Sequence, residues 1–412
     1  MRMRWLVFFG VILLIEWYAF QAFKTLFDNR WLQRGYLLVS VLILVFIIVT
    51  FYNFDRSIGQ NRQFLTASGL LLLVYLPKAV IAVFLMGEDI LRVFTGIFNF
   101  CSGSAGADAQ LLPTRRKFLS TIALGAASIP FISVLYGIVQ GRFNYKVIKQ
   151  TVYFDDLPEE FDGMKIMQLS DIHSGSFDHR EKIQHGIDLI NDQDFDLLVF
   201  TGDLVNNFAY EMDDWIEMFS EIKNPKFGKY SVLGNHDYGD YSTWNSEKER
   251  NLNFQKIKAI FPKIGFKLLL NESVSLKNEH SEIKLVGIEN WGAGRFQKYG
   301  DLKKASDSLQ PTDFKVLLSH DPSHWEVQVR ENAMNYQLTL SGHTHGMQFG
   351  IEIPGWIKWS PAEYVYKYWA GLYHTANRYL YVNRGFGFHA YPGRVGIWPE
   401  ITLLELKKKS NS

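Results

Sequence analysis

Five short motifs each place aspartate, histidine or asparagine directly after an apolar, strand-like run. They are Asp171-Ile172-His173, Gly202-Asp203, Gly234-Asn235-His236-Asp237, Ser319-His320-Asp321 and Gly342-His343-Thr344-His345-Gly346. In open α/β sheets, ligands bind at the carboxyl ends of the strands, so we expect these motifs to converge. Carboxylate and amide oxygens with imidazole nitrogens form the mixed ligand set that suits Mn, Fe or Zn. The motifs therefore predict a two-metal hydrolytic centre.

Composition narrows the class of protein. The chain has 412 residues, more than one ordinary domain, and a formal net charge of +1, which implies no nucleic-acid partner. Its single cysteine, Cys101, excludes an intramolecular disulfide framework and a cysteine-rich zinc site.

The first third of the chain predicts a membrane region over residues 1–139. It holds apolar stretches near the ~20 residues needed to cross a bilayer; they are residues 5–23, 35–52, 65–86 and 118–139. Glu16 and Lys78 lie inside two of these stretches, where charged groups are costly and usually face a partner. Either the two side chains contact each other, or each reaches the membrane surface separately.

A basic segment precedes the fourth stretch. Thr114-Arg115-Arg116-Lys117-Phe118-Leu119-Ser120 resembles the twin-arginine export signal of bacteria, and the alternative is a positive stop that orients an ordinary membrane helix. Both interpretations keep Arg115, Arg116 and Lys117 cytoplasmic. With four spans, we expect a multi-pass protein of the bacterial inner membrane whose catalytic domain is extracytoplasmic.

After a predicted linker at residues 140–150, residues 151–408 have the composition of a soluble α/β domain. In the first part of this domain, predicted helices with apolar residues at helical spacing, as in residues 180–190 and 247–261, alternate with predicted strands. From Phe266 onward, predicted strands dominate. This order predicts two packed mixed sheets flanked by helices, a four-layer α/β/β/α sandwich.

The five motifs, in this order and spacing, resemble the calcineurin-like metallophosphoesterases over nearly the whole soluble domain. The closing segment, with Arg384-Gly385-Phe386-Gly387 and Arg394, resembles the membrane-associated bacterial branch of that family. The resemblance implies one divalent metal bound by Asp171, His173 and His345. It implies a second bound by Asn235, His320 and His343, with Asp203 bridging the two metals.

The resemblance also implies a mechanism, in which a hydroxide bridging the metals attacks phosphorus. His236 is then expected to contact the substrate phosphate and assist the leaving group, or alternatively only to orient Asn235. Many relatives carry an acid three residues after the bridging aspartate as partner of this histidine, whereas this chain has Asn206, and Asp237 could substitute. A second departure is Met347, where close relatives usually have glycine.

Other residues carry less specific predictions. The histidines outside the motifs are expected to be surface or core residues rather than ligands, and among them His389 is the best candidate for a residue that supports the ligands. Arg384 and Arg394 either bind phosphate or form structural ion pairs. An aromatic cluster could lie at a membrane interface, line a groove or pack in the core; it comprises Trp356, Trp359, Tyr364, Tyr366, Tyr368 and Trp369.

The membrane region favours a lipid-linked or cell-envelope substrate with a phosphodiester, pyrophosphate or phosphomonoester bond, although a soluble phosphoester is also compatible with the motifs. The alternative from a different class is a non-catalytic metal-binding or sensing module on a membrane anchor. The intact ligand set argues against that alternative.

Overall fold

The computed structural model describes residues 2–102, 112–294, 296–353 and 355–409, and the chain divides into two compact units. The helical unit comprises Met1–Phe54 and Gln63–Ile138. The α/β unit comprises Val139–Ser412 together with the short segment Asp55–Arg62, which lies between two helices of the helical unit in sequence.

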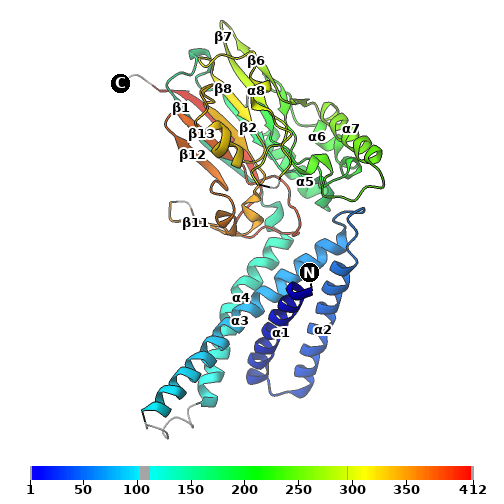
Figure 1. Cartoon of the computed structure of the whole chain (residues 1–412), viewed down its shortest axis with the longest axis vertical. Helices are drawn as coiled ribbons and strands as arrows, with labels where there is room; N and C mark the ends of the chain where they lie inside the picture. Colours follow the sequence, from blue (N-terminus) through cyan, green and yellow to red (C-terminus); the bar gives the residue numbers. More distant parts are fainter. Residues whose placement is uncertain (1, 103–111, 295, 354, 410–412) are drawn as a thin grey trace. The chain divides into compact units, whose positions relative to one another are not determined.

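The helical unit is built from four long helices (Figure 1). They are α1 (Arg2–Leu26), α2 (Arg30–Tyr52), α3 (Arg62–Cys101) and α4 (Leu112–Val139). By length and composition, each contains a stretch able to cross a membrane. Each predicted span lies within one helix, but α3 has 40 residues and continues well past residue 86. Just past residue 86, Glu88 and Asp89 pair with Arg115 and Arg116 of α4, at 3.8 and 2.9 Å respectively.

A buried polar contact links three helices of this unit. Nζ of Lys78 donates to both carboxylate oxygens of Glu16, at 2.7 and 2.9 Å, and to Oγ of Ser40 at 2.9 Å. Of the alternatives for Glu16 and Lys78, the structure shows the direct contact. The pairing compensates two charges that would be costly in an apolar surrounding.

The α/β unit contains the remaining helices and all strands of the described residues. Its helices are α5 (Arg180–Asn191), α6 (Ile216–Ser220), α7 (Glu247–Lys263) and α8 (Leu302–Ala305). Its strands are β1 (Lys146–Phe154), β2 (Lys165–Leu169), β3 (Leu197–Phe200), β4 (Lys229–Ser231), β5 (Lys267–Leu268), β6 (Glu272–Asn278), β7 (Ser281–Gly287), β8 (Lys315–Leu318), β9 (Leu338–Ser341), β10 (Ile351–Ile353), β11 (Ile357–Trp359), β12 (Gly371–Thr375), β13 (Arg378–Val382) and β14 (Glu400–Lys408).

These strands form two mixed sheets and a small hairpin. The first sheet has the order β1-β14-β2-β3-β4-β5, and only the β14–β2 pair is antiparallel. The second has the order β12-β13-β9-β8-β7-β6, with antiparallel pairs at both edges. Strands β10 and β11 pair separately. In both sheets the central strands are parallel, so their carboxyl ends lie at one edge.

The first strand departs from the prediction. β1 begins at Lys146, within the segment predicted as a linker, and pairs in parallel with β14 from Lys146↔Glu400 onward. Its first six residues are only partly buried or exposed, because β1 is an edge strand. The segment therefore lacks the apolar alternation by which a strand is recognised.

Three apolar clusters define the layers. Ile166, Val199, Leu285 and Leu338 belong to a cluster shared by the two sheets. The other face of the first sheet packs on α5, α6 and α7, and the other face of the second packs on α8 and the turn Trp325–Val329. This arrangement confirms the predicted four-layer α/β/β/α sandwich of two mixed sheets.

Candidate metal centre

The predicted site residues all follow central strands of the two sheets. Asp171 and His173 follow β2, Asp203 follows β3, Asn235 and His236 follow β4, His320 follows β8, and His343 and His345 follow β9. Because β2, β3 and β4 are parallel neighbours, as are β8 and β9, the residues collect at the carboxyl ends of both sheets.

The backbone at these strand ends is strained. Left-handed φ angles, uncommon for residues other than glycine, occur at Asp171 (52°), His173 (48°), Asp203 (61°), His343 (73°) and His345 (49°). Such strain persists where surrounding contacts hold it and clusters at functional sites. One such contact is the backbone N–H of His343, which lies 3.0 Å from each carboxylate oxygen of Asp171.

The loops after β3 and β4 approach each other closely. A Cβ on Gly234 would overlap Oδ1 of Asp203, so only glycine fits at this position. The same carboxylate oxygen accepts the backbone N–H of His236 at 2.8 Å. The Gly-Asn-His-Asp motif thus positions Asp203 as well as its own side chains.

One ligand group contains Asp171, His173 and His345, whose candidate ligand atoms lie within 4.8 Å of one another. Nε2 of His345 lies 3.3 Å from Oδ1 of Asp171. This Nε2 atom is buried and has no hydrogen-bond partner. A cation at this position would supply the missing partner, so the group fits a divalent metal.

A second ligand group contains Asp203, His320 and His343, again within 4.8 Å. Oδ1 of Asn235 lies 3.1 Å from Nε2 of His320, so the amide oxygen points at the same position. Oδ2 of Asp203 lies 3.1 Å from Nε2 of His320 and 3.6 Å from Nε2 of His173. The Asp203 carboxylate therefore faces both groups, as a bridging ligand must.

The histidines are held by hydrogen bonds at the ring nitrogen that faces away from the candidate metal positions. Nδ1 of His320 lies 2.7 Å from the carbonyl oxygen of Thr201, which leaves Nε2 for a metal. Nδ1 of His173 lies 3.0 Å from Oδ1 of Asn206. Such contacts fix ring orientation and tautomer in metal sites.

Two tyrosines complete this support. The hydroxyl of Tyr366 lies 2.9 Å from Nε2 of His343, and Nδ2 of Asn235 donates to the hydroxyl of Tyr241 at 3.0 Å. The second bond turns the Asn235 amide so that its oxygen faces the ligand group. Sequence reasoning missed both roles: Tyr366 appeared only as part of the aromatic cluster, and Tyr241 lies in no motif.

Burial and neighbouring charges shift the pKa values of Asp203 and His320 in opposite directions. Burial alone would raise the pKa of Asp203, but the charges of His320 and His236 hold it well below its usual range. Burial alone would lower the pKa of His320, but the charge of Asp203 raises it to about 10. Burial and the neighbouring His389 hold the pKa of His173 well below its usual value. The buried carboxylates therefore require positive charge beside them.

His236 has a backbone partner rather than an acid. Its Nδ1 lies 2.8 Å from the carbonyl oxygen of Asn206, which leaves Nε2 as the ring nitrogen available to a substrate. The suggestion that Asp237 substitutes for the missing acid is wrong. The Asp237 carboxylate instead accepts backbone N–H groups of Asp203, Leu204 and Gly234, at 2.8–2.9 Å.

His389 lies closer to the centre than the sequence indicated. Its ring stacks on that of His173, with centroids 4.5 Å apart, and meets the His236 ring edge-on at 4.4 Å. His173, His236 and His389 form a third group with candidate ligand atoms within 4.8 Å. Nδ1 of His389 lies 3.1 Å from Oδ1 of Asn206. No motif identified this role.

The two arginines of the closing segment are occupied by structural contacts. Arg384 pairs with Glu400 and, at 2.6 Å, with Glu352. Arg394 is fully buried, donates to the carbonyl oxygens of residues 384, 385 and 387, and lies 3.1 Å from Nδ1 of His345. Of the two interpretations of these arginines, the structural one is confirmed for Arg384. Met347 has a left-handed φ of 48°, a backbone region that glycine adopts most readily.

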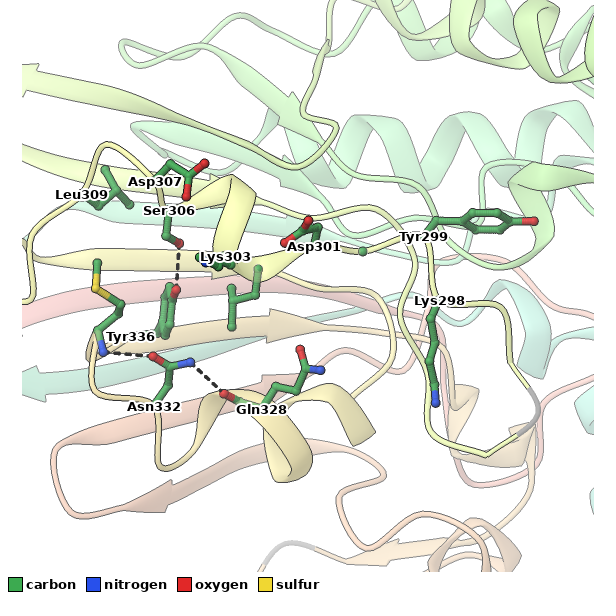
Figure 2. Close-up of a pocket in the computed structure, with 13 residues that line it drawn as sticks. Lys298, Tyr299, Asp301, Lys303, Ser306, Asp307, Leu309, Gln328, Asn332 and Tyr336 are labelled. Carbon is green, nitrogen blue, oxygen red and sulfur yellow. Dashed lines mark hydrogen bonds between the residues drawn. The ribbon is translucent and has the colours of Figure 1, made fainter.

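A separate pocket of about 830 Å³ lies beside α8 (Figure 2). Its lining combines Lys298, Asp301 and Lys303 with Gln328 and Asn332. None of the residues lining it belongs to a ligand group, so we place the candidate centre at the strand ends and not in this pocket. The eight predicted site residues are brought together there, and their individual roles remain predictions.

Comparison with known proteins agrees with this geometry. The family described as "Calcineurin-like phosphoesterase" matches residues 164–347, and the one described as "Probable Calcineurin-like phosphoesterase, transmembrane domain" matches residues 3–142. The chain is 31% identical over 301 residues to "Uncharacterized metallophosphoesterase YkuE" of Bacillus subtilis, an alignment that covers 71% of this chain and 98% of the relative.

Two further relatives extend the comparison. "Transmembrane protein with metallophosphoesterase domain" of Danio rerio is 28% identical, over 76% of this chain and 70% of its own length. "Phosphodiesterase YaeI" of Escherichia coli is 28% identical, over 71% of this chain and 99% of its own length. The chain therefore belongs to the calcineurin-like metallophosphoesterase family, and it is a phosphoric ester hydrolase with a transmembrane domain.

Proposed function

We propose that the chain is a dinuclear phosphoesterase, which hydrolyses a phosphodiester, pyrophosphate or phosphomonoester bond. The observation that carries this proposal is the Asp203 carboxylate, whose Oδ2 faces His173 of one ligand group and His320 of the other. Asp171, His173 and His345 would hold one cation, and Asn235, His320 and His343 the other, with Asp203 shared. When bound, two such cations supply Lewis acidity and a nucleophilic water near neutral pH.

His236 is the residue we assign to the leaving group. The Asn206 carbonyl holds its Nδ1, so Nε2 can contact a phosphoryl oxygen or exchange a proton with the departing oxygen. Its ring is further held between Tyr241 and His389, with centroids 4.6 and 4.4 Å away. The proposed hydrolysis needs no nucleophilic serine or cysteine, because water would attack phosphorus directly.

The test uses the purified full chain, stripped of metal and reloaded with Mn, Fe or Zn. We would compare hydrolysis of a chromogenic phosphodiester, a phosphomonoester and a lipid-linked pyrophosphate, with His343→Ala as control. Metal-dependent turnover that is lost in the control is expected. Tight metal binding without turnover of any of the three substrates would overturn the proposal in favour of a binding or sensing module.

We further propose a lipid-linked or envelope-associated substrate, and a catalytic domain on the extracytoplasmic side of a bacterial inner membrane. The four apolar helices support attachment, and a single crossing by α4 would put the α3–α4 connection on the membrane face opposite to the α/β unit. Cys101 ends α3 and is exposed. A membrane-impermeant maleimide should therefore label Cys101 in inside-out vesicles and not in intact cells. Labelling in intact cells would show the opposite orientation.

A further inference from the structure

The segment Asp55–Arg62 is part of the α/β unit, although it connects α2 to α3 in sequence. Gly59 is buried against the ring of Phe208, and the carbonyl oxygen of Arg56 accepts Oγ–H of Ser242 at 2.8 Å. Phe208 closely follows Asn206, and Ser242 is adjacent to Tyr241. The segment thus packs on the two loops that support the ligand groups.

Gln60 makes the most specific contact of this segment. Its Oε1 accepts the backbone N–H of Ala390 at 2.9 Å, and its Nε2 lies 3.2 Å from Nε2 of His389. The amide nitrogen can only donate, so Nε2 of His389 must accept. The proton of the neutral His389 ring is therefore on Nδ1.

That proton continues the network towards a metal ligand. Nδ1 of His389 lies 3.1 Å from Oδ1 of Asn206, and Nδ1 of His173 lies 3.0 Å from the same oxygen. An amide oxygen has two lone pairs and can accept both hydrogens. His173 then carries its proton on Nδ1, and its Nε2 has a free lone pair on the side of Asp203, 3.6 Å away.

We propose that Gln60 is a positioning residue of the metal centre. It fixes the orientation and tautomer of His389, and through the shared Asn206 oxygen it supports the ligand orientation of His173. A segment between two membrane helices therefore contributes to the centre, and a fragment that begins after α4 lacks this contact. Of the measurements that test the role of Gln60, only turnover rests on the proposed function.

The experiment compares Gln60→Leu with Ile58→Ala in the purified full chain. Leucine keeps the volume of Gln60 and removes both hydrogen bonds. Ile58 is exposed in the same segment and serves as the matched control. The first readout, in metal-free protein, is the rate at which diethylpyrocarbonate modifies His389, measured by mass spectrometry.

We expect modification of His389 to be severalfold faster in Gln60→Leu and unchanged in Ile58→Ala, because Gln60 covers Nε2. The second readout is turnover with metal, which should fall roughly tenfold in Gln60→Leu, as for other residues that support metal ligands. In a His389→Ala background, Gln60→Leu should have no further effect on turnover.

Two results would overturn the proposal. One is an unchanged modification rate in Gln60→Leu, and the other is a loss of turnover by Gln60→Leu that adds fully to that of His389→Ala, as expected if the segment is only structural. If wild-type protein shows no turnover while the modification rate still rises, the proposed function fails and the positioning of His389 by Gln60 stands.

Discussion

Oδ2 of Asp203 lies 3.1 Å from Nε2 of His320, although the two residues follow strands of different sheets. Asp203 follows β3 and His320 follows β8. The contact joins the carboxyl ends of the two sheets at one place. The site is therefore a product of the sandwich and cannot form from either sheet alone.

Loss of a ligand should abolish activity without unfolding the chain. In Asp203→Ala and His343→Ala we expect phosphodiester hydrolysis to fall to background, because each variant removes a side chain that faces a candidate metal position. Circular dichroism checks that the fold is kept. Substantial activity in both variants would refute the assigned ligands.

The loss of activity on replacing His236 should depend on the leaving group of the substrate. For a substrate whose alcohol is a poor leaving group, His236→Ala should lower kcat by a factor of roughly 10²–10⁴, the usual contribution of general acid–base catalysis. For a nitrophenyl ester, whose leaving group needs no proton, the loss should be much smaller. Equal losses for both substrates would instead indicate that His236 binds the phosphoryl group or only orients Asn235.

The Arg384–Glu400 ion pair is buried and should be important for stability. Glu400 also accepts the hydroxyl of Tyr381 at 2.6 Å. Arg384→Met leaves the carboxylate without its ionic partner and should lower the free energy of unfolding by about 3–5 kcal/mol. Arg180→Met is the matched control, since Arg180 and its partner Glu217 are largely exposed. Similar unfolding midpoints for the two variants would contradict this account.

Glu211 should make stability depend on pH. Burial raises the pKa of its carboxyl group to about 7, from a usual value of 4.5, although the backbone N–H groups of Asn206 and Asn207 partly offset this. The folded state therefore binds the proton more tightly than the unfolded state. This stabilisation is complete below about pH 4.5 and is lost as the pH rises to about 7, amounting to about 3 kcal/mol.

Glu211→Gln removes that titration. The thermal midpoint of the wild-type chain should fall more between pH 5 and pH 8 than that of Glu211→Gln, when both are measured in the same detergent. Parallel curves for the two proteins would show that Glu211 does not contribute to the pH dependence.

The Glu16–Lys78 pair should behave as a buried pair in the helical unit. Lys78→Met alone leaves Glu16 without its cation and should destabilise the unit by about 3 kcal/mol. Adding Glu16→Leu should recover most of that loss, because no uncompensated charge remains. Unfolding in increasing dodecyl sulfate measures both variants. A double variant no better than Lys78→Met would argue for a role beyond charge compensation.

The layers and the eight clustered residues could be predicted because short stretches of sequence indicate both. Apolar runs such as residues 197–201 lead directly into Gly202-Asp203, so strand, turn and ligand appear in one short stretch. Helical spacing of apolar residues likewise identifies α5 from sequence alone. Patterns of this kind need no knowledge of distant contacts.

Most of the supporting residues could not be predicted in this way, and His389 was named only as a candidate. Gln60 and His389 are 329 positions apart, and neither belongs to a motif. Tyr241 and Tyr366 act through single hydroxyl groups, which look the same in sequence as those of tyrosines in the core. The suggestion that Asp237 could support His236 failed because sequence adjacency does not show that its carboxylate accepts backbone N–H groups of residues 203, 204 and 234.

The most direct test of the central claim is the metal content of the purified full chain, measured by plasma mass spectrometry alongside phosphodiester turnover, for wild type and Asp203→Asn. We predict two divalent cations per active wild-type chain, and fewer than two in Asp203→Asn together with loss of turnover. Full turnover with a single cation, or an Asp203→Asn variant that keeps both cations and full activity, would contradict a dinuclear centre bridged by Asp203.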